Sequence, residues 1–328
     1  MLITKTPFRI SFCGGGSDLE SFYAKHGGCV LSTSINKYMY ISIHPYFDSN
    51  YTMLKYSENE LVDNVSKIKH KIFKHVLTEM NIDGVEISST ADVPGGTGLG
   101  SSSTFTVGLL NTLCCYKGKF ASKAKLANEA CEVEIDKLGA PIGKQDQYAA
   151  AFGGLNFIKF NKDGTVSVSP VMMLAETYKK LQKNLMMFYT GTTRSANSIL
   201  SEQKKNMSDE EKANNLIKMC DLAYEMKDAL ENNDLSTFGK ILNDSWELKR
   251  TLASGISNPE IDKAYEIAMN NGALGGKLLG AGGGGFLLFY CEEENQDKLR
   301  KEIGLKEFDF KFEQDGTSVV YIGDKYWR

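Results

Sequence analysis

Two kinds of hydrophobic periodicity divide the chain into strand-like and helix-like segments. Segments in which β-branched and aromatic residues alternate or cluster predict strands at 38–44, 85–89, 285–291 and 318–322. Apolar residues at helical spacing predict helices at 104–116, 124–137 and 214–232. Strands dominate the first 60 residues and long helices dominate about 196–270, so the pattern predicts a mixed α+β protein.

The size of the chain predicts more than one domain. Its 328 residues exceed what one hydrophobic core usually serves and suit two domains of roughly 150 residues each. A polar stretch at 174–184 separates a strand-rich half from a helix-rich half. We therefore expect an N-terminal domain at 1–178 and a C-terminal domain at 179–328.

Composition narrows the possible function classes. Hydrophobic residues make up 42% and charged residues 24% of the chain, as in ordinary globular proteins. A formal net charge of -3 gives no general attraction to nucleic acid or to a membrane, so neither is expected as a partner. No apolar run reaches the length of about 18 residues that a spanning helix needs, and the N-terminus lacks a signal-peptide pattern. The seven cysteines contain no C-x-x-C pair, and these features together predict a cytoplasmic protein with reduced thiols.

A glycine- and serine-rich segment lies between a predicted strand and a predicted helix. It reads P-G-G-T-G-L-G-S-S-S from residue 94 to residue 103. Such a turn directs several backbone N–H groups outward at the positive end of the helix dipole, which suits the oxygens of a phosphate group. The three serines add hydroxyls that can cap the helix or ligate Mg²⁺. The segment lacks the G-K-[ST] ending of a Walker loop, and Ser103 replaces the third glycine of a G-x-G-x-x-G motif.

This segment resembles the ATP-binding signature P-x-x-x-G-L-G-S-S of the GHMP kinases, a family named for galactokinase, homoserine kinase, mevalonate kinase and phosphomevalonate kinase. The match runs without a gap from Pro94 to Ser102. The resemblance implies that the phosphates of ATP bind at Pro94, Gly95, Gly96, Thr97, Gly98, Leu99, Gly100, Ser101, Ser102 and Ser103. It also implies a two-domain α+β fold: an N-terminal domain with a left-handed βαβ phosphate loop, and a C-terminal ferredoxin-like domain, with the active site between them.

Two further motifs of the family occur in the family's order. P-F-R-I at 7–10 matches its N-terminal motif, and Asp18 follows Arg9 by nine residues, as in galactokinase-like members. The resemblance assigns Arg9 to charge stabilisation at the transferring phosphoryl group and Asp18 to substrate hydroxyls. K-L-L-G-A-G-G-G-G at 277–285 resembles the C-terminal motif, which lies beside the substrate and here supplies Gly282 and Gly283. Because a strand-like run follows this loop, a Rossmann dinucleotide site is not expected there.

The resemblance also assigns catalytic and metal-binding carboxylates. Residues 138–154 resemble the family segment with the catalytic aspartate, which makes Asp146 the candidate general base. Glu134, twelve residues upstream, aligns with the acidic residue that ligates Mg²⁺ together with the second serine of the loop, Ser102. Carboxylate and hydroxyl oxygens suit this hard cation. Glu132 is the alternative metal ligand.

The predicted substrate is a sugar phosphate. Gly15 and Gly16 stand where galactokinases carry Glu-His, which disfavours galactose. The segments at 12–28, 143–154 and 188–197 resemble the D-glycero-D-manno-heptose 7-phosphate kinases, which form the 1,7-bisphosphate for GDP-heptose and bacterial surface polysaccharides.

A phosphate on the acceptor needs groups to bind it. We expect backbone N–H groups of Gly15, Gly16 and Ser17 to form an anion-binding nest, with Arg194 supplying a guanidinium. A fucose-type sugar 1-kinase and a non-catalytic sugar-binding regulator remain alternatives. The sequence is compatible with a monomer and with a homodimer.

Overall fold

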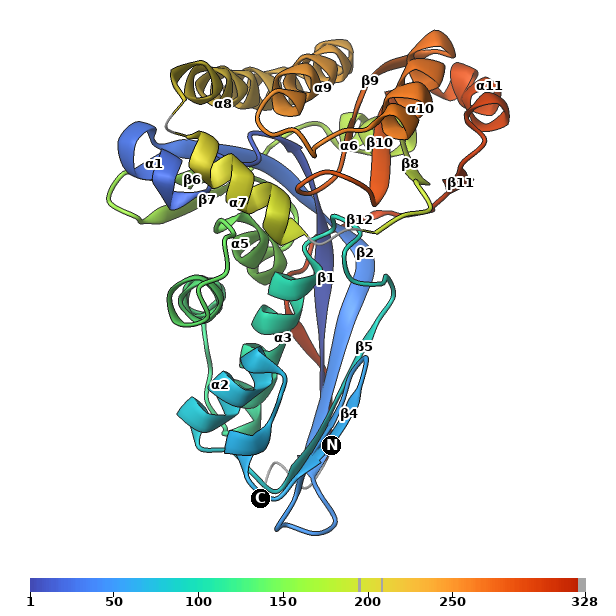
Figure 1. The fold of residues 1–328 in the computed structure, drawn as a ribbon. Coiled ribbons are helices and arrows are strands. Elements are labelled where there is room, and N and C mark those ends of the chain that lie inside the picture. Colours follow the sequence, from blue (N-terminus) through green and yellow to red (C-terminus); the bar gives the residue numbers. More distant parts are fainter. Residues whose placement is uncertain (194–195, 208, 324–328) are drawn as a thin grey trace.

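Two β-sheets organise the described part of the chain (Figure 1). The computed structural model describes residues 1–193, 196–207 and 209–323. The larger sheet has nine strands and the smaller has four. The mixed α+β architecture predicted from the sequence is confirmed. Among the described residues, no helix is both long enough and apolar enough to cross a bilayer.

The larger sheet is built on the antiparallel pair of β1 (Leu2–Cys13) and β2 (Gly28–Pro45). Since β1 occupies one edge of β2, the strands β5 (Val85–Ala91), β12 (Phe312–Glu313) and β6 (Leu155–Phe160) share its other edge. The remaining strands are β3 (Thr52–Lys55), β4 (Asn59–Val62), β7 (Val166–Pro170) and β13 (Ser318–Ile322). β13 pairs with β1, so the chain returns to its first sheet near its end.

Most of the helices that cover this sheet lie between residues 65 and 152 of the chain. They are α1 (Glu20–His26), the 3₁₀ turn η1 (Val65–Lys67), α2 (Lys71–Met80), α3 (Ser101–Tyr116), α4 (Lys123–Cys131), the π-helical segment η2 (Glu132–Lys137) and α5 (Gln145–Phe152). The predicted helix at 124–137 is thus an α-helix continued by a π-helical turn. The part of β1 from Thr6 onward is buried on both of its faces. The helices α3, α5, α8 and α9 all pack against this strand.

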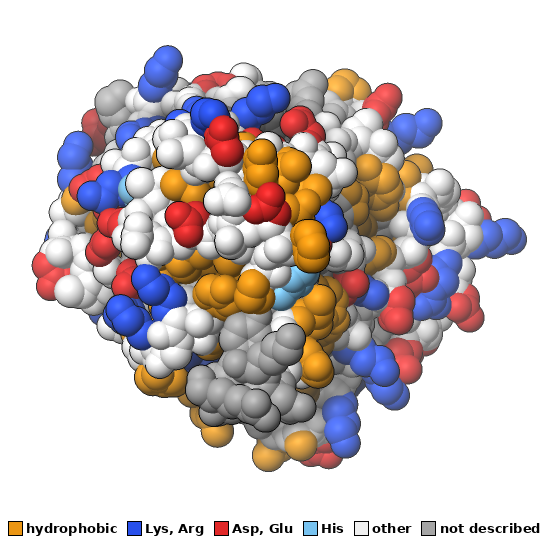
Figure 2. Space-filling view, turned by 90° about the horizontal axis from the view of Figure 1, so that it is seen from below, with side chains coloured by type: hydrophobic (Ala, Val, Ile, Leu, Met, Phe, Trp, Pro, Cys, Tyr) orange, Lys and Arg blue, Asp and Glu red, His pale blue; other side chains and the backbone are white. Residues whose placement is uncertain are grey.

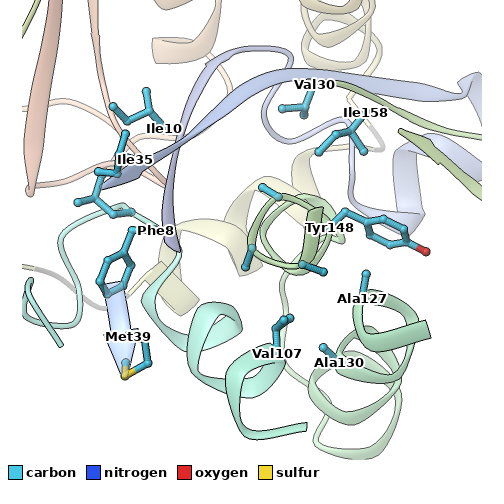
Figure 3. Packing of buried hydrophobic residues seen from close by; sticks show 14 of the residues in the cluster. Phe8, Ile10, Val30, Ile35, Met39, Val107, Ala127, Ala130, Tyr148 and Ile158 are labelled. Atoms are coloured by element: carbon cyan, nitrogen blue, oxygen red, sulfur yellow. The ribbon is translucent and has the colours of Figure 1, made fainter. Parts of the chain in front are cut away.

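Helix α5 lies at the centre of the packing around this sheet. It contacts β1, β2 and β6 as well as α3 and α4. Figure 3 shows Tyr148 of α5 among Val30 and Ile158 from the sheet and Ala127 and Ala130 from α4. The first turn of α5 carries Asp146, so this core fixes the position of one candidate catalytic residue.

The smaller sheet is antiparallel, with the strand order β11 (Lys306–Glu307), β8 (Leu185–Tyr189), β10 (Phe286–Cys291) and β9 (Ala273–Leu278). The helices of this half are α6 (Ala175–Asn184), α7 (Ala196–Asn206), α8 (Glu210–Glu231), α9 (Leu235–Arg250), α10 (Pro259–Asn270) and α11 (Glu293–Ile303). The polar stretch expected to be a junction forms the amphipathic helix α6, whose Thr177 and Leu181 are buried. The domain boundary at 178/179 and the handedness of the phosphate-loop crossover stay predictions.

A continuous apolar core joins the two sheets. Phe12 of β1 packs edge-on against Phe238 of α9 at 5.3 Å between ring centroids, and Phe238 packs against Tyr290 of β10 at 5.7 Å. The two halves therefore meet through packed aromatic rings, which restrict their relative movement. The exterior differs: in Figure 2, which views the lower end of Figure 1, basic and acidic side chains are interspersed.

Candidate active site

A cavity of about 410 Å³ lies where β1, the glycine-rich loop before α3, helix α5 and the loop between β9 and β10 meet. Most residues assigned to the site from the sequence line it. These are Arg9, Gly15, Gly16, Asp18, Gly96, Gly98, Gly100, Ser101, Ser102, Ser103, Glu134 and Asp146. Residues that are far apart in the sequence and were assigned to the site thus line one cavity.

The glycine-rich loop bends through left-handed backbone conformations and leads directly into α3. Gly96, Gly98 and Gly100 have φ values of 76°, 86° and 80°, which side chains other than glycine rarely allow. The N-cap of α3 is Gly100, and no side chain caps the helix. The serines therefore lie within the first turn instead of capping it, and the helix begins three residues earlier than its apolar pattern predicts.

Four residues of the predicted phosphate site do not line this cavity. The side chains of Thr97 and Leu99 are buried, and the hydroxyl of Thr97 donates a hydrogen bond to the carbonyl oxygen of Pro94 at 3.0 Å. Pro94 and Gly95 instead line a neighbouring cavity of about 670 Å³ on the other side of the loop. The two cavities share Gly96, Ser101 and Ser102, so the loop forms a wall between them.

The loop between β9 and β10 lies against the phosphate loop, backbone to backbone. A Cβ on Gly98 would lie 2.4 Å from the carbonyl oxygen of Leu279, and one on Gly280 would lie 2.5 Å from the Cα of Gly98. Only glycine permits this approach. Gly282 and Gly283, assigned to the substrate from the sequence, instead pack on Ile256 and do not line the cavity, whereas Gly280 and Ala281 do.

Arg9 links three parts of the site. Its Nε and Nη2 lie 2.7 Å from Oδ1 of Asp146, and its Nη1 donates to the carbonyl oxygen of Gly98 at 2.6 Å. The other carboxylate oxygen of Asp146, Oδ2, faces Gly100, where an added Cβ would lie 3.2 Å away. Arg9 is 4% exposed and the side chain of Asp146 is 24% exposed, so the guanidinium is shielded from water while the carboxylate stays partly accessible.

Glu134 is a buried carboxylate beside the first turn of α3. Its Oε1 accepts a hydrogen bond from the Ser102 hydroxyl at 2.7 Å, and its Oε2 accepts one from Nε2 of Gln147 at 2.8 Å. Burial raises the pKa of Glu134, while the hydrogen bonds from Ser102, Ser103 and Gln147 act in the opposite direction. Glu132, the alternative, is exposed and accepts a hydrogen bond from Asn128.

The π-helical segment accounts for the different orientations of these two glutamates. The N–H of Leu138 donates to the carbonyl oxygen of Val133 at 3.1 Å, an i→i+5 bond that widens the turn. Val133 and Glu134 are consequently buried in succession, while Glu132 faces outward. A regular helical period does not reveal such a turn.

Asp18 accepts three hydrogen bonds at the opposite side of the cavity. They come from the backbone N–H of Gly16 at 3.0 Å and from the backbone N–H and side-chain amide of Gln145 at 3.1 and 3.2 Å. Burial raises the pKa of Asp18, and the negative charge of Asp146 raises it further. Gln145 is thus a direct partner of a predicted substrate-binding residue.

At Gly15–Ser17, where the sequence predicts an anion-binding nest, the structure shows a different set of hydrogen bonds. The hydroxyl of Ser17 binds the backbone of Cys29, donating to its carbonyl oxygen and accepting from its N–H. Ser17 therefore anchors the loop to β2 and does not line the cavity. The N–H of Gly16 already donates to Asp18. Arg194 lies outside the described residues.

Two lysines that sequence reasoning did not assign to the site also line the cavity. Lys249 of α9 and Lys277 of β9 are each 6% exposed. Burial lowers the pKa of Lys249 to about 8 and that of Lys277 to about 7, and the neighbouring Lys249 and Arg9 lower the latter further. Lys277 donates to the carbonyl oxygen of Phe12 at 3.0 Å. Their only sequence signal is a lysine on an otherwise apolar, buried face, which is weak.

Comparison with known proteins agrees with this geometry. The GHMP kinases N terminal domain matches residues 64–154, and the GHMP kinases C terminal domain matches residues 226–308. D-glycero-alpha-D-manno-heptose 7-phosphate kinase of Campylobacter jejuni is 32% identical over 99% of this chain and 98% of its own length. The bifunctional fucokinase/GDP-fucose pyrophosphorylase of Arabidopsis thaliana is 26% identical over 93% of this chain but 31% of its own length.

A solved structure extends the similarity to the whole fold. The D-glycero-D-manno-heptose 1-phosphate kinase of Bacteroides thetaiotaomicron superposes with a TM-score of 0.80 at 25% identity, covering 99% of this chain and all of that one. The chain belongs to the GHMP kinase family. It is an enzyme of the sugar kinase class, and as a kinase it uses ATP.

The contact between the two glycine loops generates a first prediction. Gly98→Ala should lower kcat/KM for ATP by about 10²-fold, because the new methyl group must displace a loop that positions phosphate, and a shift near 1 Å has that effect. Steady-state kinetics with varied ATP measures it. Gly118→Ala is the matched control, because Gly118 also has a positive φ of 66° but nothing within 4 Å of its Cβ position. Equal kinetics for both variants would contradict the proposed contact.

The buried Lys277 generates a second prediction, about stability. Its pKa is about 7 in the folded protein and ordinarily 10.5, so between these values the unfolded chain binds the proton more tightly. Stability therefore rises with pH across this window, by at most about 1.4 kcal/mol per pH unit. The Tm of the ligand-free wild type should rise relative to that of Lys277→Met from pH 7 to pH 9. A parallel pH dependence of the two Tm values, as expected for the exposed control Lys240→Met, would refute this.

Proposed function

We propose that the enzyme transfers the γ-phosphoryl group of ATP to the anomeric hydroxyl of D-glycero-D-manno-heptose 7-phosphate and forms the 1,7-bisphosphate. One observation carries the proposal: the Arg9–Asp146 pair, the Ser102–Glu134 pair and Asp18 all face one cavity bounded by the phosphate loop. The name of the Campylobacter relative describes a heptose that already carries a phosphate at position 7. The name of the Bacteroides relative also describes a heptose phosphate, but with the phosphate at position 1, so only the Campylobacter name supports a 7-phosphate acceptor. The proposed heptose kinase activity follows from these two facts together.

The neighbouring cavity offers a place for the nucleoside of ATP. It is lined by Tyr56, His70 and Phe105, aromatic rings that suit stacking with a base. Its shared wall with the acceptor cavity is the start of α3, where free backbone N–H groups and the helix dipole favour phosphate oxygens. In this arrangement the phosphates pass along the loop from one cavity to the other.

Glu134 and Ser102 fit the requirements of a magnesium site. Both offer oxygen ligands within hydrogen-bonding distance of each other, and in the part of the chain that the structure describes, the buried carboxylate has no basic side chain as its partner. When bound, Mg²⁺ supplies positive charge that offsets the charge on the phosphate oxygens. Gln147 holds the carboxylate in place through its other oxygen.

Arg9 and Asp146 act on the reacting groups themselves. In phosphoryl transfer the catalyst must position the acceptor and stabilise charge on the transferring group. Asp146 keeps Oδ2 directed toward the phosphate loop, where it can accept a proton from the acceptor hydroxyl, and Arg9 supplies a fixed positive charge.

An acceptor panel tests the proposal. ATP consumption is measured with D-glycero-D-manno-heptose 7-phosphate, the unphosphorylated heptose, L-fucose and galactose, and ³¹P NMR of the product locates the new phosphate. We expect the highest kcat/KM with the heptose phosphate and a new signal from an anomeric phosphate. A preference for L-fucose would favour the fucokinase alternative, and sugar binding without product would favour a regulator.

The role of Asp146 leads to a third prediction. Asp146→Asn should lower kcat by about 10² to 10⁴-fold, because the amide cannot accept the hydroxyl proton. The Asn oxygen can still accept hydrogen bonds from Arg9, so ATP binding should persist, with some loss of Tm from the weakened ion pair. Single-turnover kinetics and separate ATP titration distinguish these effects. Retention of more than about a tenth of wild-type kcat would remove Asp146 from the base role.

The two glutamates of the π-helical segment give a fourth prediction with an internal control. Glu134→Gln should raise the Mg²⁺ concentration required for half-maximal rate by about tenfold or more, because a charged oxygen ligand is lost. Glu132→Gln, a change of the same chemistry on an exposed side chain two residues away, should leave this concentration unchanged. Rates measured across a Mg²⁺ series decide the matter, and the opposite ranking would assign the metal to Glu132.

A further inference from the structure

Buried polar groups without partners lie around the cavity wall next to Asp18. Of the residues that carry them, Ser11 and Gln145 line the cavity, whereas Gln203 is fully buried beside Gly16. Among the described residues, Oγ of Ser11, Oε1 of Gln145 and Nε2 of Gln203 have no hydrogen-bond partner although each is buried. Buried polar atoms are normally paired, so each unpaired atom calls for an explanation such as a missing ligand. All three surround one short segment, the Gly15–Gly16 turn.

The glycines of this turn leave space for those polar groups. A Cβ on Gly15 would lie 3.5 Å from Oγ of Ser11 and 3.7 Å from the side-chain amide of Gln145. A Cβ on Gly16 would lie 2.1 Å from Nε2 of Gln203 and 3.3 Å from Nζ of Lys249. The turn therefore faces two unpaired groups that can donate, the Ser11 hydroxyl and Nε2 of Gln203, together with one unpaired acceptor, Oε1 of Gln145.

Lys249 supplies positive charge at this place. Its Nζ donates to the carbonyl oxygen of Gly15 at 3.0 Å and to Oε1 of Gln203 at 3.1 Å. An ammonium group has three donors, so one remains for a ligand. The charges that face it are those of Asp18 and Lys277. Asp18 accepts its hydrogen bonds from Gly16 and Gln145, so among the described residues it does not occupy the third donor of Lys249.

We propose that Lys249 and the side-chain amide of Gln203, beside the Gly15–Gly16 turn, bind the phosphate that the acceptor already carries. This inference rests on the proposed heptose phosphate kinase function and assigns the residues that give it specificity for a phosphorylated acceptor. An ammonium and an amide N–H are suitable donors to the oxygens of a phosphate monoester. Asp18, on the same turn, is left to bind a sugar hydroxyl between this phosphate and the reacting end.

Because Lys249 is buried, its ammonium group can distinguish a charged ligand from a neutral one. In water a single lysine contributes little to phosphate binding, whereas in a shielded site the same contact is stronger. Burial also lowers the pKa of Lys249, so an anion that restores its full charge is bound in preference to a neutral hydroxyl. An acceptor without a phosphate leaves this charge unpaired and should bind poorly.

The test compares two acceptors across matched variants. Wild type, Lys249→Met and Lys240→Met are each assayed with D-glycero-D-manno-heptose 7-phosphate and with the unphosphorylated heptose at saturating ATP. Lys240 is an exposed lysine on the same helix and serves as the control. We expect Lys249→Met to lower the ratio of kcat/KM for the phosphorylated acceptor to kcat/KM for the unphosphorylated heptose by about 10²-fold, and Lys240→Met to keep the wild-type ratio.

The outcomes separate this inference from the function on which it rests. If wild type prefers the phosphorylated acceptor and Lys249→Met retains that preference, or loses both activities equally, the assignment of Lys249 is wrong while the kinase function stands. If wild type does not distinguish the acceptors, the proposed substrate and the inference both fail. A collapse of the preference in Lys249→Met alone supports the inference.

Two further measurements keep the test decisive if Lys249→Met folds poorly. Gln203→Leu removes the unpaired amide at similar volume and should lower kcat/KM for the phosphorylated acceptor alone, by about five- to tenfold. Calorimetric binding of heptose 7-phosphate without ATP gives a readout independent of turnover and should weaken in both variants. Unchanged binding in Gln203→Leu and Lys249→Met would overturn the assignment.

Discussion

The ion pair between Arg9 and Asp146 is the interaction on which the rest of the site depends. Arg9 is on β1 and Asp146 begins α5, and the same guanidinium donates to the carbonyl oxygen of Gly98 in the phosphate loop. The backbone N–H of Arg9 also donates to Leu99 at 3.2 Å. A buried arginine requires such partners, since an unpaired charge in a shielded position costs several kcal/mol. The requirement to pair one cation thus brings the sheet, the loop and the helix together at a single point.

The second half of the chain completes the site from the other side. The backbone of Gly280 touches that of Gly98, and the ring of Phe238 lies between those of Phe12 and Tyr290. These contacts explain why a loop more than a hundred residues away in sequence bears on phosphate binding. They also explain the glycines at 280–285: several allow close approach to the backbone, and few of them need to touch a substrate.

Sequence reasoning predicted the elements and the central residues of the site because these have strong local signals. Strand and helix patterns identified β2, β5, α3, α8 and β10, and motif resemblance brought Arg9, Asp18 and Asp146 into consideration. Features set by tertiary packing could not be predicted in the same way. The π-helical turn that buries Glu134, the anchoring of Ser17 on Cys29 and the packing of Gly282 on Ile256 each depend on a distant or irregular backbone contact.

The burial of the two lysines is the feature of the site that is hardest to predict from the sequence. In the sequence Lys249 is one of many lysines, and its place on the apolar face of a helix is only a weak indication of burial, because lysines are mostly exposed. In the fold it is held in a site where three acidic residues, Asp18, Glu134 and Asp146, face three basic ones, Arg9, Lys249 and Lys277.

These charges are not all paired with one another. Arg9 binds Asp146, whereas Glu134 is bound by neutral side chains and Lys277 by a carbonyl oxygen. The fold keeps two carboxylates, of Asp18 and Glu134, and two ammonium groups buried without an ion-pair partner within hydrogen-bonding distance among the described residues, each at a cost in stability. Such an arrangement is favourable only when ligands of the opposite charge enter: a cation beside Glu134 and anionic groups beside the lysines. The distribution of unpaired charge is therefore in place before any ligand binds, and it suits the metal ion and the phosphorylated substrates that we propose.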